Sequence, residues 1–170
     1  GRPVHLTLAH LVDNDKYRNF YLEEKKNGSV IIMDNSAFEF TQEGKGYLTG
    51  AEIVDYAKRI NADYAVMTDY PGEDRQRTID AAKEQAPLFK EAGLKTFFVP
   101  QGKVGDRDDY IECFRWGAEN PDLVGFAEGL SRITKTPDGY VKPDENWVVG
   151  SIASDLNNVT RNIGRKEFLS

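Results

Sequence analysis

Short apolar runs alternate with longer amphipathic segments along most of the chain. The runs are rich in β-branched and aromatic residues, and each is followed by turn residues and then by apolar positions at helical spacing. They start roughly every 30 residues, the length of one strand plus one covering helix. This pattern predicts an α/β domain of repeated strand–helix units, with strands at His5–Val12, Ser29–Met33, Asp63–Thr68, Lys95–Val99 and Leu123–Ala127.

Capping residues mark where the predicted helices begin and end. Asn14 precedes a helix that runs to Lys25. Thr49, with Glu52 three residues later, has the pattern of a capping box. A helix starting near Glu73 contains Pro87, which is predicted to bend or divide it because proline lacks the amide hydrogen that the preceding turn needs.

Other segments carry weaker signals. Residues Asp34 to Tyr47, with two glycines, are predicted to form a loop, and a further helix is predicted over Asp108–Ala118. After Ser131 the pattern is less regular. Trp147–Ile152 fits either a sixth strand or a helix start, and Asn158–Leu169 has helical spacing.

Two architectures fit this element order. A doubly wound sheet closes comfortably at 170 residues, whereas a TIM-type (β/α)₈ barrel typically needs about 250. However, the glycine-rich turn of nucleotide-binding open sheets is missing after the first strand, where the chain reads His10-Leu11-Val12-Asp13-Asn14. We therefore expect a TIM-type barrel that is incomplete relative to eight units. It forms a single domain over residues 1–170, regular to about residue 131 and less regular over 132–170.

Composition narrows the class of protein. The formal net charge is −6 and the pI is near 5.0, so the overall field would repel a polyanion, although basic residues outnumber acidic ones between Ser131 and Lys166. No apolar run is long enough to span a bilayer, so no membrane partner is expected and the predicted location is cytoplasmic. Cys113 is the single cysteine, which excludes a cysteine-cluster zinc site, and we predict no metal and no cofactor.

Polar residues follow each apolar run at corresponding places. They are His10, Asp34, Asp69, Gln101 and the pair Glu128-Gly129. Because the ends of parallel strands in α/β folds share one mouth, these side chains are predicted to converge there. Each also has a structural interpretation: the aspartates as caps or turn formers, Gln101 as part of a Pro-Gln-Gly turn, and His10 as a packed histidine.

Four segments together resemble the base-pocket motifs of the tRNA-guanine (queuine) transglycosylase family. They are Met33-Asp34-Asn35-Ser36-Ala37-Phe38-Glu39, Val66-Met67-Thr68-Asp69, Val99-Pro100-Gln101-Gly102 and Glu128-Gly129-Leu130-Ser131. Their order and approximate spacing are similar to those of the family, and most similar to its phage and bacterial relatives that place 7-deazaguanines in DNA. The resemblance covers the chain from about Leu6 to Leu130.

The resemblance implies roles for particular residues. Asp34 would be the catalytic carboxylate that transfers protons beside the base, and Phe38 the aromatic ring that stacks on it. Asp69 would bind the donor edge of the base, Gln101 its carbonyl side, and the backbone of Gly129 and Leu130 the remaining edge. The implied partners are guanine or a 7-deazaguanine, with DNA or tRNA as the nucleic acid that is modified.

Departures from the family keep three functions open. The family reads Asp-Ser-Gly-Gly-Phe where this chain has bulkier residues, and after Ser131 only Asp155 is a candidate for the nucleophilic aspartate. The first hypothesis is base exchange, in which guanine in DNA or tRNA is replaced by a 7-deazaguanine. The second is a binding protein that keeps the base pocket without the nucleophile. The third is an unrelated barrel glycoside hydrolase that uses Asp34 and Asp69 as acid and base.

Overall fold

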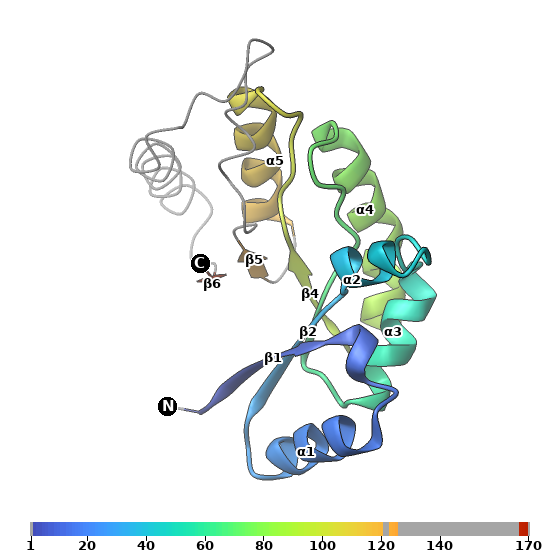
Figure 1. Ribbon diagram of the computed structural model, residues 1–170. Coiled ribbons are helices and arrows are strands. Elements are labelled where there is room, and N and C mark those ends of the chain that lie inside the picture. Colours follow the sequence, from blue (N-terminus) through green and yellow to red (C-terminus); the bar gives the residue numbers. More distant parts are fainter. Residues whose placement is uncertain (1, 121–122, 126–166, 170) are drawn as a thin grey trace. The chain divides into compact units, whose positions relative to one another are not determined.

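A computed structural model describes residues 2–120, 123–125 and 167–169 (Figure 1). The chain divides into two compact units. The first comprises Gly1–Thr68 and Ala82–Phe97, and the second comprises Asp69–Ala81 and Phe98–Ser170. The single domain expected over residues 1–170 stays a prediction.

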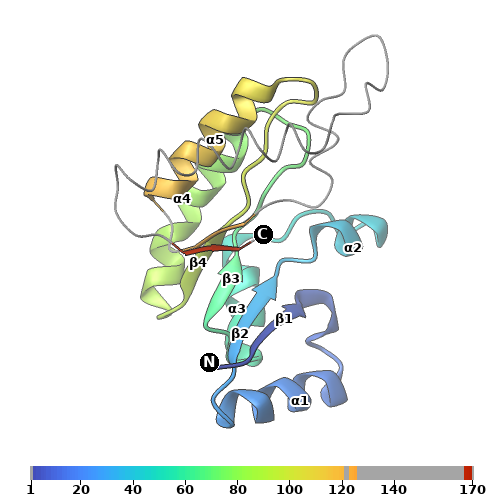
Figure 2. The same cartoon turned by 90° about the vertical axis from the view of Figure 1, so that its left-hand side faces the viewer.

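A parallel sheet is the centre of the first unit. Its strands are β1 (Val4–Leu8), β2 (Val30–Asp34), β3 (Tyr64–Val66) and β4 (Lys95–Phe98). Each strand pairs in parallel with the next one along the chain, as Figure 2 shows. This unbroken chain order is that of a TIM-barrel wall, whereas a doubly wound sheet reverses its order at a switch point. The predicted α/β class with barrel-type strand order is confirmed.

Helices follow the strands, and two of them begin at the capping residues predicted for them. They are α1 (Asp15–Lys26), α2 (Ala37–Gln42), α3 (Gly50–Arg59), α4 (Arg75–Glu91) and α5 (Arg107–Glu119), with a short 3₁₀ turn at Ala9–Leu11. Asn14 caps α1 by accepting a hydrogen bond from the Tyr17 amide, and both halves of the Thr49–Glu52 capping box form at α3. Within the first unit α1 packs on β2 and α3 on β3 (Figure 1).

Strand β2 is buried on both faces. Ile31 and Met33 are fully buried, and Ile32, which points the other way, is 3% exposed. The continuous apolar run of this strand accounts for its burial, because a strand covered on one face only would alternate apolar with polar residues. The core of this unit continues through Ile53 and Ile60.

The second unit has its own core on α5. Tyr110, Cys113 and Phe114 are buried, and Trp116 packs edge-on against Phe98 with ring centroids 5.0 Å apart. Burial raises the pKa of the Cys113 thiol to about 12, so this thiol packs in the core as a neutral group. Strand β5 (Leu123–Gly125) pairs in parallel with β6 (Glu167–Leu169).

Two predictions of secondary structure are wrong because contacts with other parts of the fold, and not the local sequence pattern, decide the conformation. The segment predicted as a loop over Asp34–Tyr47 contains helix α2, whose Phe40 is buried and lies near the ring of Tyr56. The end of the segment with helical spacing, Asn158–Leu169, forms strand β6, because pairing with β5 decides the conformation there. Residues 158–166 of that segment and the ambiguous Trp147–Ile152 lie outside the described residues.

Two boundary predictions are also wrong. The first strand was expected to continue to Val12, but β1 ends at Leu8 and the chain turns into the 3₁₀ segment. Pro87 does not divide α4, which is one continuous helix, and the alternative that it bends the helix stays a prediction. Pro87 and Lys83, the residue four positions earlier whose carbonyl loses its partner, are both exposed, so proline here costs less than in a buried turn.

Among the described residues, no helix is both long and apolar enough to cross a membrane. In the same part of the chain no group of three or more potential metal-ligating side chains is found.

Candidate functional site

Asp34 is the last residue of β2 and is half-buried. Its Oδ2 accepts a hydrogen bond from the Ser36 amide at 3.1 Å. Burial raises the pKa of the Asp34 carboxyl above its ordinary value. The hydrogen bond from the Ser36 amide lowers this pKa in part, and the nearby charge of Glu39 raises it further. A carboxyl whose pKa is raised in this way is suited to exchanging protons closer to neutral pH.

Ser36 links Asp34 to His10. Ser36 is fully buried and adopts a left-handed conformation, with φ of 54°, just before α2. Its Oγ lies 3.0 Å from His10 Nδ1 and accepts a hydrogen bond from the His10 amide at 3.2 Å. The register of β1 and β2 pairs Leu8 with Asp34, so the residues that follow both strands meet at the same edge of the sheet.

Asn35 fixes the turn between β2 and α2. Its side-chain amide donates to the carbonyl of Met67 at 2.9 Å, and its Oδ1 accepts from the Ala37 amide at 3.0 Å. Asn35 is buried. Asn35 therefore connects the end of β2 to the segment after β3. Its hydrogen bond from the Ala37 amide also caps the start of α2, where the N-cap residue Ser36 makes no capping side-chain hydrogen bond.

Asp69 and Gln101 meet in the second unit. Gln101 Nε2 donates a hydrogen bond to Asp69 Oδ2 at 2.7 Å. The two side chains are 8% and 7% exposed, so a carboxylate and a carboxamide lie side by side away from bulk water. Asp69 comes three residues after β3 and Gln101 three residues after β4. The structure thus brings together two of the predicted site residues.

Contacts within the loop that carries Asp69 hold it in place. The Tyr70 amide donates to Thr78 Oγ1 at 3.1 Å, and the Arg77 guanidinium lies 3.9 Å above the Tyr70 ring. Gly72 has a positive φ of 78°, and its carbonyl accepts from the Val104 amide at 3.4 Å. The last contact joins the loop of Asp69 to the loop of Gln101.

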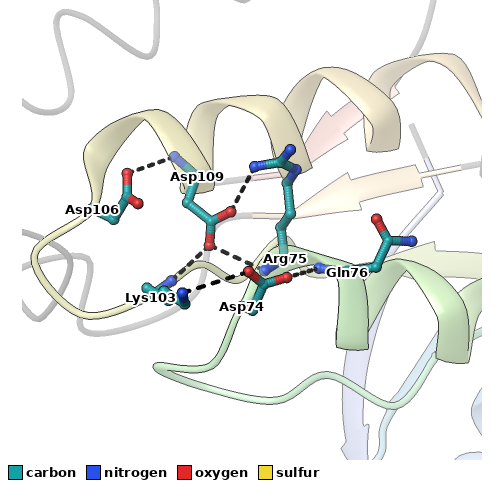
Figure 3. A network of polar contacts seen from close by, with 6 residues as sticks. All are labelled: Asp74, Arg75, Gln76, Lys103, Asp106 and Asp109. Atoms are coloured by element: carbon teal, nitrogen blue, oxygen red, sulfur yellow. Dashed lines mark hydrogen bonds and ion pairs between the residues drawn. The ribbon is translucent and has the colours of Figure 1, made fainter.

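Asp109 ties the same two loops to α5, as Figure 3 shows. Its carboxylate is 4% exposed and accepts from the amides of Lys103 and Arg75 at 2.9 and 3.1 Å and from Arg75 Nη1 at 2.8 Å. Burial alone would raise the pKa of Asp109, but the hydrogen bonds from Lys103 and Arg75 and the Arg75 charge outweigh it and hold the pKa below its ordinary value. Asp106 caps α5 beside it.

Gly102 brings the loop of Gln101 close to α5. A Cβ atom at this position would lie 2.7 Å from the backbone nitrogen of Tyr110. No side chain fits there without moving backbone, so the residue after Gln101 is fixed by contact with the first turn of the helix. The Pro-Gln-Gly segment thus forms a structural turn and also positions the Gln101 side chain.

The remaining predicted site residues are placed as follows. Phe38 lies in the first turn of α2 and is 71% exposed, and its stacking role stays a prediction. Gly129 and Leu130 lie outside the described residues, as do Glu128 and Asp155. The prediction that Asp34 shares one cavity with Asp69 and Gln101 also stays a prediction.

Sequence reasoning missed Asp109, Arg75 and the Ser36–His10 contact. Asp109 stands three residues after the cap Asp106, where an acidic residue is ordinary in the first turn of a helix. Its partner Arg75 is 34 residues away, so no local pattern indicates the pair. Ser36 and His10 are 26 residues apart. His10 was noted as a residue at a strand end, which was the one signal available.

Comparisons with known proteins give a likeness of fold only. No protein-family model matches the chain, and no curated protein matches it. Among solved structures, the chain is similar to D-psicose 3-epimerase from Clostridium cellulolyticum H10, crystallised with D-tagatose. The similarity has a TM-score of 0.49 and 12% identity and covers 99% of this chain and 74% of the epimerase chain.

Proposed function

We propose that this chain binds a guanine-like base at its strand ends and exchanges guanine in DNA or tRNA for a 7-deazaguanine. The observation that carries the proposal is the buried pair of Asp69 and Gln101, whose side chains are 2.7 Å apart after consecutive strands. The order of the motifs around Asp34, Asp69, Gln101 and Gly129 supports the same assignment.

The chemistry of this pair is complementary to a guanine edge. That edge offers N–H donors at N1 and at the exocyclic amine, beside a carbonyl oxygen. A carboxylate accepts hydrogen bonds only, and a carboxamide can donate to a carbonyl. Asp69 would accept from the two N–H groups, and Gln101 would turn its amide from Asp69 to the carbonyl oxygen. Adenine offers no carbonyl and would leave the amide without an acceptor.

Base exchange also needs a proton carrier and a nucleophile. One proton must reach the guanine that departs, and another must leave N9 of the incoming base, a task suited to a carboxyl with the raised pKa of Asp34. In the proposed reaction a second carboxylate attacks the anomeric carbon as guanine leaves, and the incoming base then displaces that carboxylate. Asp155, outside the described residues, is the candidate for this group.

The target nucleotide must leave its stack before it can react. Flipping costs a few kcal/mol and requires a pocket that holds the extruded base. The exposed ring of Phe38, four residues after Asp34, is the candidate to stack on it.

Two measurements on the whole chain test this function. Calorimetry with guanine, 7-deazaguanine and adenine measures binding, and incorporation of labelled guanine into DNA and tRNA measures exchange. We expect binding of the first two bases and exchange in one nucleic acid. Binding without exchange supports the second hypothesis, a protein that keeps the base pocket but lacks the nucleophile. Absence of guanine binding contradicts both.

A further inference from the structure

The Ser36 hydroxyl is a buried group whose single proton must have an acceptor. Ser36 is fully buried. Its Oγ accepts a hydrogen bond from the His10 amide at 3.2 Å and lies 3.0 Å from His10 Nδ1. Among the residues that the structure describes, these are the hydrogen-bonding contacts of Ser36 Oγ.

The two neutral forms of the His10 ring differ in whether they satisfy this hydroxyl. If Nδ1 carried the proton, the amide and the ring would both donate to Oγ. The hydroxyl proton would then have no acceptor among the described residues, which is costly for a buried group. If the proton is on Nε2, Nδ1 accepts from the hydroxyl, and both the hydroxyl proton and Nδ1 have partners. The geometry favours this second form.

We propose that Ser36 holds His10 in the form protonated on Nε2, and that this Nε2–H donates a hydrogen bond to the base bound beside Asp34, as a further catalytic residue. The inference rests on the proposed function. It adds a hydrogen-bond donor to the proposed role of Asp34.

The placement of His10 supports this role. Ser36 holds both groups, the Asp34 carboxylate through its amide at 3.1 Å and the imidazole through its hydroxyl. The His10 ring packs edge-on near Phe40, with centroids 6.2 Å apart, and is half-buried. Its Nε2 makes no hydrogen bond to any of the described residues.

The donor acts when charge develops on the ring. The Asp34 carboxylate takes the proton from N9 of the incoming base, and the electron pair of that N–H bond stays on the ring system. The negative charge then spreads to the ring acceptor atoms, where the Nε2–H of His10 stabilises it by a hydrogen bond. The Nε2 proton remains on His10 throughout, so Asp34 is the group that changes protonation.

Nitrogen NMR tests the ring form directly, without any ligand. The chain contains two histidines, His5 and His10, so their signals can be assigned with His5→Gln. At about pH 8.5, above the ordinary imidazole pKa of about 6.5, we expect a protonated Nε2 and an unprotonated Nδ1 for His10. Ser36→Ala should shift His10 towards a mixture of both forms. A proton on Nδ1 in the wild-type chain overturns the proposal.

Exchange kinetics test the donor role. We expect His10→Leu to lower kcat by about a hundredfold, as loss of one preorganised donor does, and His10→Gln, whose amide keeps an N–H group, to recover part of it. His5→Gln is the matched control, because His5 lies on β1 and its ring contacts Glu24 of α1 rather than Ser36, and this variant should leave kcat unchanged. If His10→Leu exchanges at the wild-type rate while the wild type binds guanine, the donor role is wrong and the proposed function stands. If the wild type binds no guanine, the function fails and the donor role with it.

Discussion

Gln101 donates a hydrogen bond to Asp69 across 32 residues of sequence, and both side chains are buried. A buried carboxylate needs donors, and in the free chain the Gln101 amide supplies one. A base with N–H groups beside a carbonyl can take over this role by giving Asp69 new donors and the Gln101 amide a new acceptor. Under the proposed function, the pair would exchange an internal contact for contacts with a ligand.

Asp69→Asn should weaken guanine binding by about 1 to 3 kcal/mol, because an amide donor would then face the N–H groups of the base. Isothermal titration calorimetry measures the change. Asp80→Asn, on the exposed face of α4 in the same unit, is the matched control and should bind like the wild type. An unchanged affinity of the Asp69 variant would remove this residue from the pocket.

Asp34→Asn should lower kcat for base exchange by about a hundredfold or more and change guanine affinity much less, since the carboxyl acts on protons in the transition state. The Asn side chain keeps an oxygen for the Ser36 amide, so the turn before α2 should persist. Steady-state kinetics with labelled guanine separate the two effects. A normal exchange rate would contradict the assignment of Asp34.

The raised pKa of Asp34 also predicts a pH dependence of stability. Burial disfavours the ionised carboxylate in the folded chain. The free energy of unfolding therefore loses a contribution as pH rises from the ordinary aspartate pKa of about 3.9 through the raised value. Asp34→Asn lacks this loss, so its stability relative to the wild type should increase over that range. Urea unfolding at a series of pH values measures it, and a difference that does not vary with pH would argue against a buried carboxyl.

Asp109→Ala should destabilise the chain by about 2 kcal/mol, because two backbone amides lose their acceptor while Arg75 can still be solvated. Asp109 has a lowered pKa, so its contribution is present above the ordinary aspartate pKa and is lost as pH falls through the lowered value. Asp108→Ala, at a neighbouring side chain that is 90% exposed, is the control. Equal stability of the two variants in urea at neutral pH would show that the Asp109 contacts do not stabilise the two loops.

Much of the framework could be predicted from sequence because it depends on local signals. The Thr49–Glu52 capping box and the buried run of β2 are determined within a few residues, and both formed as expected. Helix α2 was missed because its six residues are too few to show a helical period and because Gly44 and Gly46 lie just beyond its C-cap. Strand β6 was missed because its conformation depends on pairing with β5, 44 residues earlier in register.

The candidate site was predictable only in part, because some of its residues follow local signals and others depend on contacts between distant parts of the sequence. Asp34, Asp69 and Gln101 could be identified because each follows a recognisable apolar run. The partners that hold them could not, since Arg75 meets Asp109 across 34 residues and Ser36 meets His10 across 26. Nothing in the local sequence indicates that Ser36 adopts a left-handed conformation.

The most direct test of base recognition compares guanine with hypoxanthine, which lacks the exocyclic amine that Asp69 is proposed to bind. Calorimetry on the wild-type chain should show guanine binding at least about tenfold more tightly, since one hydrogen bond to a buried charged group is worth about 1.5 to 3 kcal/mol. The Asp69→Asn variant should lose this preference. Equal affinities of the wild type for the two bases, or no binding of either, would contradict the proposal that Asp69 and Gln101 form a guanine pocket.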